Sequence, residues 1–118
     1  MEERDPLTHL VIGAAIEVDR VMGPGLLESV YQKCLEHELR LRGAEFKPQA
    51  HLPLVYKDLV LEDEFIMDVF FPGQLVVELK AVEKLIPIHD AQLLTYLRLT
   101  NTRVGLLNAL GDEYQRNH

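Results

Sequence analysis

The sequence predicts a single α/β domain over residues 1–118. This length is enough for one hydrophobic core and too short for two. Apolar residues recur at three- and four-residue spacing in the first third of the chain, and again over residues 88–100, which is typical of helices. Between these parts, residues 65–82 hold two runs rich in β-branched and aromatic residues, which are typical of strands.

Two helices are expected before residue 44. The first begins at Asp5-Pro6, an N-cap followed by the preferred first helical residue, and ends near Met22, where Gly23-Pro24-Gly25 breaks it. Its expected apolar face is Leu7, Leu10, Val11, Ala14, Val18 and Val21. The second is expected over residues 26–42 with Gly43 as C-cap. Its expected buried residues are Leu27, Val30, Cys34, Leu35 and Leu39.

Short alternating segments follow over residues 44–60, with turns expected at Pro48 and at Lys57-Asp58. Because Pro53 cannot donate a ladder hydrogen bond, residues 50–56 are expected to form an edge strand. After the strand-rich part of the chain, residues 88–100 are expected to form a third helix. Residues 103–108 are expected to close the sheet as a last strand.

The two runs on either side of Pro72-Gly73 are expected to form one hairpin. Its register depends on the loop length. A two-residue loop would set Asp68 against Val77, whereas a three-residue loop from Pro72 to Gln74 sets Asp68 against Glu78. The longer loop is favoured, because it aligns the apolar residues of both strands and a one-residue slip would mix them with the charged ones. The expected apolar face is Phe65, Met67, Val69, Phe71, Leu75, Val77, Leu79 and Ala81.

In that register Asp68, Glu78 and Lys80 converge, because Glu78 and Lys80 share one face of their strand. Two carboxylates and an ammonium group in an apolar sheet are a candidate catalytic set. The alternative is an acid pair between strands that Lys80 neutralises at the edge of the sheet.

Two helices carry further polar candidates. Glu28 and Tyr31 lie three residues apart on the second helix; alternatively, Glu28 is a favourable charge in the first turn and Tyr31 packs in the core. On the third helix, His89, Gln92 and Tyr96 form one stripe, which is otherwise the polar flank of an amphipathic helix.

The composition limits the classes of function. The net charge of −7 argues against strong nonspecific binding of nucleic acid, although a local basic groove stays open. The single Cys34 excludes an internal disulfide and is expected to be a buried thiol. No signal peptide is recognisable, and no apolar run approaches the ~20 residues that a membrane span needs. A soluble cytoplasmic protein without a membrane partner is expected.

Three spaced motifs resemble a known group of enzymes. They are Gly25-x-x-Glu28-x-x-Tyr31, Asp68 followed by Glu78-x-Lys80, and Gln92-x-x-x-Tyr96. The first resembles the defining motif of the GxxExxY protein family, which is placed in the PD-(D/E)xK nuclease superfamily. The second resembles the D…ExK signature of that superfamily, and the third resembles the QxxxY element of its lambda-type exonucleases.

This resemblance implies a restriction-endonuclease-like α/β core, with a small mixed central sheet flanked by helices. It implies a Mg²⁺-dependent or Mn²⁺-dependent nuclease that hydrolyses phosphodiester bonds in DNA or RNA. The implied metal ligands are Asp68, Glu78, the main-chain carbonyl of Leu79, and Glu28.

The resemblance also implies roles for residues beside the metal. Lys80 would position or deprotonate the attacking water and neutralise charge in the transition state. The implied substrate contacts are Gln92, Tyr96 and Tyr31. Two other functions stay open. One is a regulatory module that keeps the fold and binds a nucleotide or a protein, and the other is a structural homo-oligomer such as a homodimer.

Overall fold

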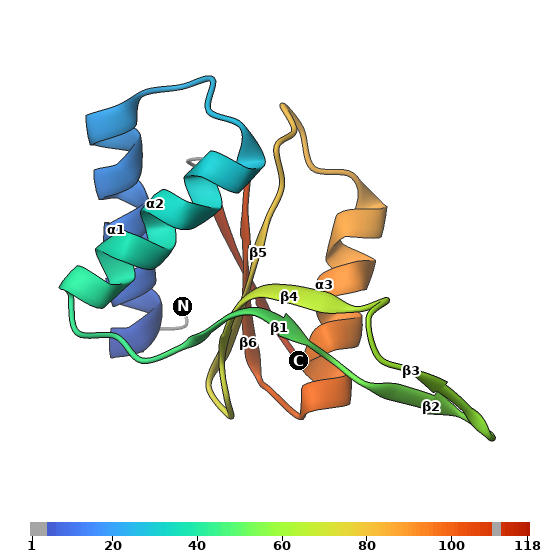
Figure 1. The fold of residues 1–118 in the computed structure, drawn as a ribbon. Coiled ribbons are helices and arrows are strands. Elements are labelled where there is room, and N and C mark those ends of the chain that lie inside the picture. The colour runs from blue at the N-terminus through green and yellow to red at the C-terminus, as the bar shows by residue number, and fades with distance from the viewer. Residues whose placement is uncertain (1–4, 110–111) are drawn as a thin grey trace.

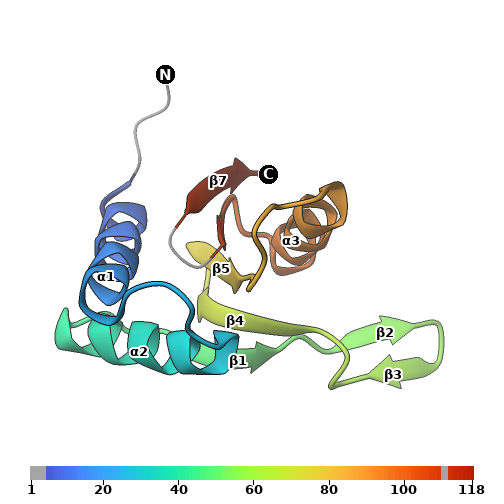
Figure 2. The same ribbon diagram turned by 90° about the horizontal axis from the view of Figure 1, so that it is seen from above.

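The structure is a computed structural model that describes residues 5–109 and 112–118. It has three layers, with one mixed β-sheet between helices (Figure 1). Helices α1 (Pro6–Met22) and α2 (Glu28–Leu41) cover one face of the sheet, and α3 (Pro87–Thr100) covers the other (Figures 1 and 2). The predicted mixed α/β class is confirmed.

The sheet has five strands in the order β1-β4-β5-β6-β7. They are β1 (Lys47–His51), β4 (Ile66–Phe71), β5 (Leu75–Leu79), β6 (Val104–Asn108) and β7 (Glu113–Asn117). Strands β5 and β6 run parallel, and the other neighbouring pairs are antiparallel. The parallel pair arises because α3 carries the chain across one face of the sheet between these strands.

The first helix begins as predicted, because the Asp5 carboxylate caps it by accepting a hydrogen bond from the Thr8 N–H at 2.8 Å. Some predicted core residues of the helices are instead exposed. They are Val21, Leu27 and Val30. Helix α2 starts at Glu28 rather than residue 26, and it buries Tyr31 and Gln32 in their place. The apolar spacing therefore indicated the helix but missed the rotation that points Gln32 at the sheet.

The β4–β5 hairpin has the predicted register. Phe71 pairs with Leu75 and Val69 with Val77, so three residues from Pro72 to Gln74 form the loop. The Gln74 N–H closes that loop by donating to the Phe71 carbonyl at 2.9 Å. The pairing of apolar residues and the loop length therefore indicate the same register, as expected because a one-residue shift of the pairing would expose core residues.

The face assignment was wrong for Phe65 and Met67. Met67 packs in the core beneath α3, and the Phe65 ring meets the Tyr96 ring edge-on at 6.0 Å. Both residues lie beyond the part of β4 that pairs with β5. Strands twist, and here the side chains of the separated segment turn toward α3.

The sheet separates two hydrophobic cores. The larger core lies under α1 and α2. Its buried residues are Val11, Ala14, Ala15, Val18, Tyr31, Leu35, Leu39, Val69, Phe71, Leu75, Val77, Leu79 and Leu106. The smaller core lies under α3, and its buried residues are Met67, Val76, Leu93, Leu97 and Leu107. Because β5 is buried on both faces, the charged Glu78 at its end is unusual.

The edges of the sheet differ from the prediction. Pro48 does not form a turn, because it lies within edge strand β1 opposite Val69. The expected edge strand 50–56 is divided between β1 and a separate hairpin, β2 (Leu54–Tyr56) and β3 (Leu59–Leu61). The turn at Lys57-Asp58 is confirmed. Strand β6 is internal, because β7 pairs on its outer side.

The helices are those of a packed α/β layer. In the part of the chain that the structure describes, no helix is long and apolar enough to cross a lipid bilayer. Cys34 on α2 is a free thiol and only half-buried, so the expectation of full burial was wrong.

Candidate active site

The candidate site lies where β4 and β5 separate. Their paired ladder ends at Val69 and Val77, and the next residues, Asp68 and Glu78, use their side chains in place of backbone partners. The Asp68 N–H donates to Oε1 of Glu78 at 3.0 Å. The Leu79 N–H donates to Oδ2 of Asp68 at 2.8 Å. The two carboxylates are thus fixed between the separating strands.

This arrangement is electrostatically costly for both acids. Glu78 is only 4% exposed, and its burial, followed by repulsion from Asp68, raises its pKa to about 8. Burial also raises the pKa of Asp68, against the hydrogen bond from the Leu79 N–H that lowers it. At neutral pH the pair therefore favours a bound proton or a nearby cation.

Lys80 lies two residues after Glu78 and approaches α3. Its Nζ donates to Oε1 of Gln92 at 3.2 Å, which joins β5 to the polar stripe of that helix. The positive charge of Lys80 lowers the pKa values of Asp68 and Glu78, although less than burial raises them. The structure thus brings together Asp68, Glu78, Lys80 and Gln92.

Glu28 reaches the same end of β5 from the first residue of α2. Its Oε1 accepts a hydrogen bond from the Ala81 N–H at 3.0 Å, across 53 positions of sequence. It also lines a cavity of about 500 Å³ together with Asp68 and Lys33. Its charge adds to the causes that raise the pKa values of Asp68 and Glu78. Glu28 is therefore directed at the site, and it is more than a favourable charge in the first turn of α2.

Tyr31 does not lie in this cavity. Its ring is 1% exposed in the core, its hydroxyl donates to the Ala15 carbonyl at 3.4 Å, and it accepts from Nδ2 of Asn108 at 3.0 Å. Burial raises the pKa of Tyr31 to about 12. A substrate contact by Tyr31 does not fit this placement, because no surface of the ring is open. The residue anchors α2, and thereby Glu28, to β6.

Tyr96 lies on the other side of the sheet from the Glu28 cavity. With Gln92, Phe65 and Ile88 it lines a smaller cavity of about 220 Å³ beside α3. Burial, followed by the charges of Glu78 and Asp68, raises the pKa of Tyr96 to about 12. The candidate residues therefore line two separate hollows, one on the α2 side of the sheet and one on the α3 side.

Two glutamines that the sequence analysis did not select contact Asp68. Gln32 is buried, and its Nε2 donates to the Asp68 carbonyl and to Oε2 of Glu36, both at 2.7 Å. The Nε2 of Gln49 donates to Oδ1 of Asp68 at 3.1 Å. The i, i+4 spacing of Glu28, Gln32 and Glu36 could have indicated one polar stripe facing the sheet. No sequence signal pointed to Gln49.

The donor set suits a hard divalent cation, which prefers oxygen ligands. Within the described part of the chain, Oε2 of Glu78 has no hydrogen-bond partner, and Oδ1 of Asp68 is held only by the neutral amide of Gln49. A cation there would offset the cost of burying the two charges, which is the main cause of both raised pKa values, and it would also relieve the repulsion among Asp68, Glu78 and Glu28. However, no three Asp, Glu, His or Cys side chains among the described residues already form a metal cage.

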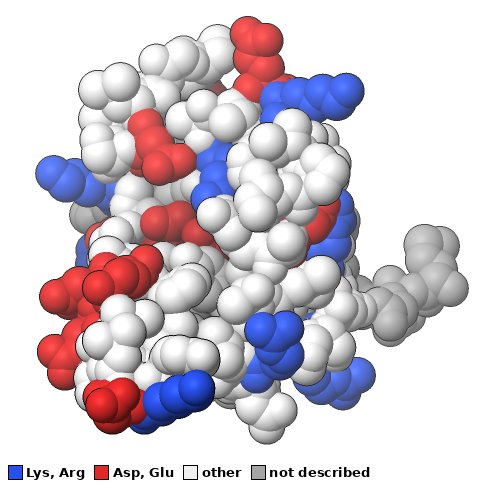
Figure 3. Space-filling view, turned by 90° about the vertical axis from the view of Figure 1, so that its right-hand side faces the viewer, with Lys and Arg blue, Asp and Glu red and all other residues white. Residues whose placement is uncertain are grey.

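One face of the molecule shows how the surface charges are distributed (Figure 3). On the face drawn in Figure 3, Lys and Arg side chains are scattered, whereas Asp and Glu gather on one side. This face of the molecule therefore lacks a broad positive platform (Figure 3). At the candidate site, Lys33 beside the larger cavity and Lys80 beside Gln92 are single cations that a phosphate could contact.

Comparison with known proteins agrees with this geometry. No curated protein matches the chain, and no solved structure matches it. A family model described as the PD-(D/E)XK nuclease superfamily matches residues 5–117, which is nearly the whole chain. Members of this superfamily are typically metal-dependent. The chain, with its mixed sheet and its Asp68, Glu78 and Lys80 at the separation of two strands, belongs to the PD-(D/E)XK nuclease superfamily.

Proposed function

We propose that this protein is a metal-dependent nuclease that hydrolyses phosphodiester bonds in DNA or RNA. The observation that carries the proposal is the pair of carboxylates at the end of β4–β5 with Lys80 beside them. Within the superfamily, we also propose the GxxExxY family, on the basis of Gly25, Glu28 and Tyr31.

Residues from two strands and one helix would hold the metal ion. Asp68, Glu78 and the Leu79 carbonyl would hold Mg²⁺ or Mn²⁺, and Glu28 would complete the set from α2. The bound ion would supply Lewis-acid stabilisation of the phosphoryl oxygens and a lowered pKa for the attacking water. Orientation of the substrate and stabilisation of its developing charge would depend on side chains of the protein.

Lys80 is the group suited to stabilise charge. Its ammonium, held by Oε1 of Gln92 at 3.2 Å, would face negative charge that develops on the phosphate. Glu28 lies in the first turn of α2, and this end of a helix favours an anionic substrate group. Gln92 and Tyr96 line the hollow on the α3 side, where they would orient a nucleotide next to the scissile bond.

A second function is supported by a specific observation. The carboxylates of Asp68, Glu78 and Glu28 all accept hydrogen bonds from backbone N–H groups, so they also stabilise the separated strands. Together with the net charge of −7, this favours a regulatory module that binds a nucleotide or a protein without cleaving nucleic acid. The two functions differ in one measurable property: a nuclease cleaves its substrate repeatedly, whereas a regulatory module binds its ligand without cleaving it.

Lys80→Ala tests the nuclease proposal. The wild-type protein is incubated with Mg²⁺ or Mn²⁺ and with single- and double-stranded DNA and RNA, and the products are separated by gel electrophoresis. We expect cleavage that needs the metal, and loss of cleavage in Lys80→Ala without loss of the cooperative thermal transition. Lys84→Ala changes an exposed lysine four residues away and should leave cleavage unchanged.

Three results would contradict the nuclease proposal or the role of Lys80 in it. Cleavage that persists in Lys80→Ala would remove Lys80 from the chemistry. A large loss of stability in that variant, roughly 3 to 5 kcal/mol, would instead identify Lys80 as the structural counter-ion of buried acids. If a folded wild-type protein binds Mg²⁺ but cleaves none of the four substrates, the binding module is favoured.

A further inference from the structure

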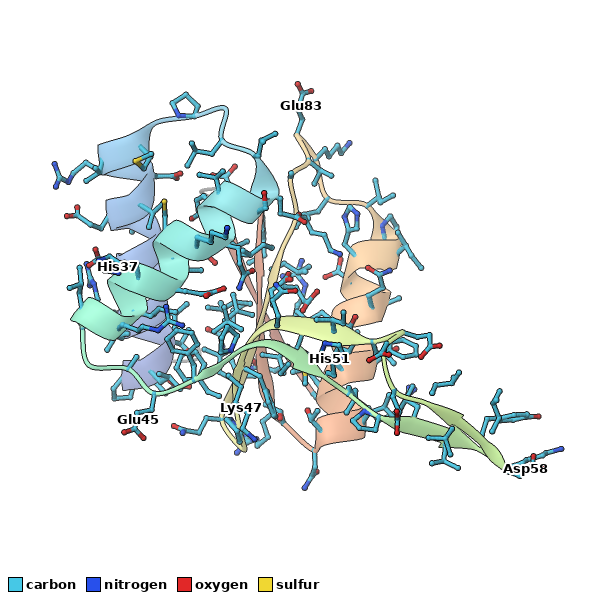
Figure 4. All side chains as sticks on the ribbon, viewed as in Figure 1. His37, Glu45, Lys47, His51, Asp58 and Glu83 are labelled. Carbon is cyan, nitrogen blue, oxygen red and sulfur yellow. The ribbon has the colours of Figure 1, made fainter. Side chains whose placement is uncertain are left out.

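Gln49 has a backbone conformation that a β-strand does not need. It lies within β1, an edge strand of the five-stranded sheet, whose two ends are Lys47 and His51 (Figure 4). Its φ angle is 46°, in the left-handed region that glycine adopts freely and other residues adopt at a cost. The backbone of Gln49 is therefore held against its local preference.

The other non-glycine residues with positive φ, in the part of the chain that the structure describes, lie where this conformation is ordinary. Lys57 is in the turn between β2 and β3, and Asn101 caps the C-terminus of α3. Gln49 follows neither pattern. Strained backbone persists where the surrounding structure imposes it, and it is concentrated at ligand sites. The strain at Gln49 therefore points to a functional contact.

The side chain of Gln49 contacts Asp68. The β1–β4 pairing has the same register on both sides of Gln49, so Gln49 lies opposite Asp68. Its Nε2 donates to Oδ1 of Asp68 at 3.1 Å, while the Leu79 N–H donates to Oδ2 at 2.8 Å. The Asp68 carboxylate is thus held by one donor from each neighbouring strand, which fixes its orientation.

The donor at Gln49 is neutral, which leaves the negative charge of Asp68 available. A lysine or arginine here would form a charged hydrogen bond with the carboxylate and compete with a cation for it. An amide N–H occupies one lone pair of Oδ1 and leaves a second for a cation. Gln49 and Asp68 also line the same cavity of about 500 Å³ as Glu28. The amide therefore orients Asp68 without neutralising it.

We propose that Gln49 is a positioning residue of the metal site, which fixes the Asp68 carboxylate in the orientation that binds the divalent cation. This inference rests on the metal-dependent function proposed above. Removal of a group that hydrogen-bonds to a metal ligand typically costs about 10- to 100-fold in metal affinity or activity. The alternative is that Gln49 only distorts the edge strand, which protects it from pairing with other chains.

Binding of Mn²⁺ to the metal-free full chain is the first test. Free Mn²⁺ is measured by electron paramagnetic resonance during a titration. Gln49→Met keeps the length of the side chain and removes its donor, so the dissociation constant should rise by roughly 10- to 100-fold.

Gln115→Met is the matched control. Gln115 lies on β7, the opposite edge strand of the sheet. Its Nε2 also donates to a neighbouring side chain at 3.1 Å, but that partner is Asn117 and not a candidate metal ligand. This variant should bind Mn²⁺ as the wild type does.

Thermal melting in EDTA separates the positioning role from a structural one. Gln49→Gly removes the same donor and relieves the left-handed strain, because glycine has no Cβ. It should therefore melt no lower than the wild type, while its Mn²⁺ dissociation constant rises as in Gln49→Met. A residue that only stabilises the strand would show the opposite pattern.

Four outcomes would overturn the proposal. If the wild type and Gln49→Met bind Mn²⁺ equally, the amide does not position Asp68, although the metal site itself stands. If Gln115→Met weakens binding as much as Gln49→Met does, the effect is not specific to the site. If Gln49→Gly melts several degrees below the wild type in EDTA, Gln49 stabilises the strand and any loss of affinity is indirect. A wild type that binds no Mn²⁺ would remove the metal-dependent function together with this inference.

Discussion

The buried acid pair leads to a prediction about stability and pH in metal-free protein. Glu78 is 4% exposed, and its pKa is raised to about 8 from an ordinary value of 4.5, by burial first and then by the charge of Asp68. Glu78→Gln removes the charge but keeps an Oε1 that can accept the hydrogen bond from the Asp68 N–H. The variant therefore isolates ionisation from structure.

The sign of the effect follows from proton linkage. Between its unfolded and folded pKa values, Glu78 is ionised in the unfolded chain and protonated in the folded one, so the folded state binds the extra proton. The stabilisation by this proton is fully present below pH 4.5 and is lost as the pH rises through 8. The wild type should lose about 3 to 4 kcal/mol from this group between pH 5 and pH 8.

Urea unfolding in EDTA from pH 5 to pH 8.5 measures this effect. The wild-type free energy of unfolding should fall by about 3 to 4 kcal/mol relative to that of Glu78→Gln between pH 5 and pH 8. Thermal melting at the same pH values should show a matching difference in melting temperature of roughly 10 °C. Glu62→Gln, at an exposed site after β3, is the control and should follow the wild type. Parallel curves for the wild type and Glu78→Gln would refute the reasoning.

Three further predictions address the site and the fold. Mg²⁺ or Mn²⁺ at a hundred times its dissociation constant should stabilise the wild type by about 2.7 kcal/mol and raise its melting temperature. Asp68→Asn should abolish this rise. An unchanged melting temperature in the wild type would count against metal binding. Gln32→Leu leaves the Asp68 carbonyl without its donor at 2.7 Å and should cost about 1 to 3 kcal/mol in urea unfolding; a change under about 0.5 kcal/mol would be that of an ordinary surface site. Gly105→Ala would set a Cβ 2.8 Å from Leu93 Cδ1 in the core and should destabilise by about 1 to 3 kcal/mol; unchanged unfolding would show that Leu93 can move.

The local pattern of the sequence was enough to predict the register of the β4–β5 hairpin and the start of α1. The three-residue loop after Phe71 could be predicted, because side chains alternate with period two and a slip would mix charged with apolar residues. The opposition of Asp68 and Glu78 followed from that register alone. The start of α1 was equally local, since the Asp5 cap acts on Thr8 within one turn.

Only the tertiary structure decided which distant groups meet. The contact of Glu28 with the Ala81 N–H spans 53 positions, and the contact of Gln32 with Asp68 spans 36. Both depend on how α2 packs across the sheet, which helical periodicity does not encode. The burial of Tyr31 is of the same kind, because its hydroxyl finds Asn108 on β6, 77 positions away. The sequence determined the candidate acids, and packing decided which of them face a common gap.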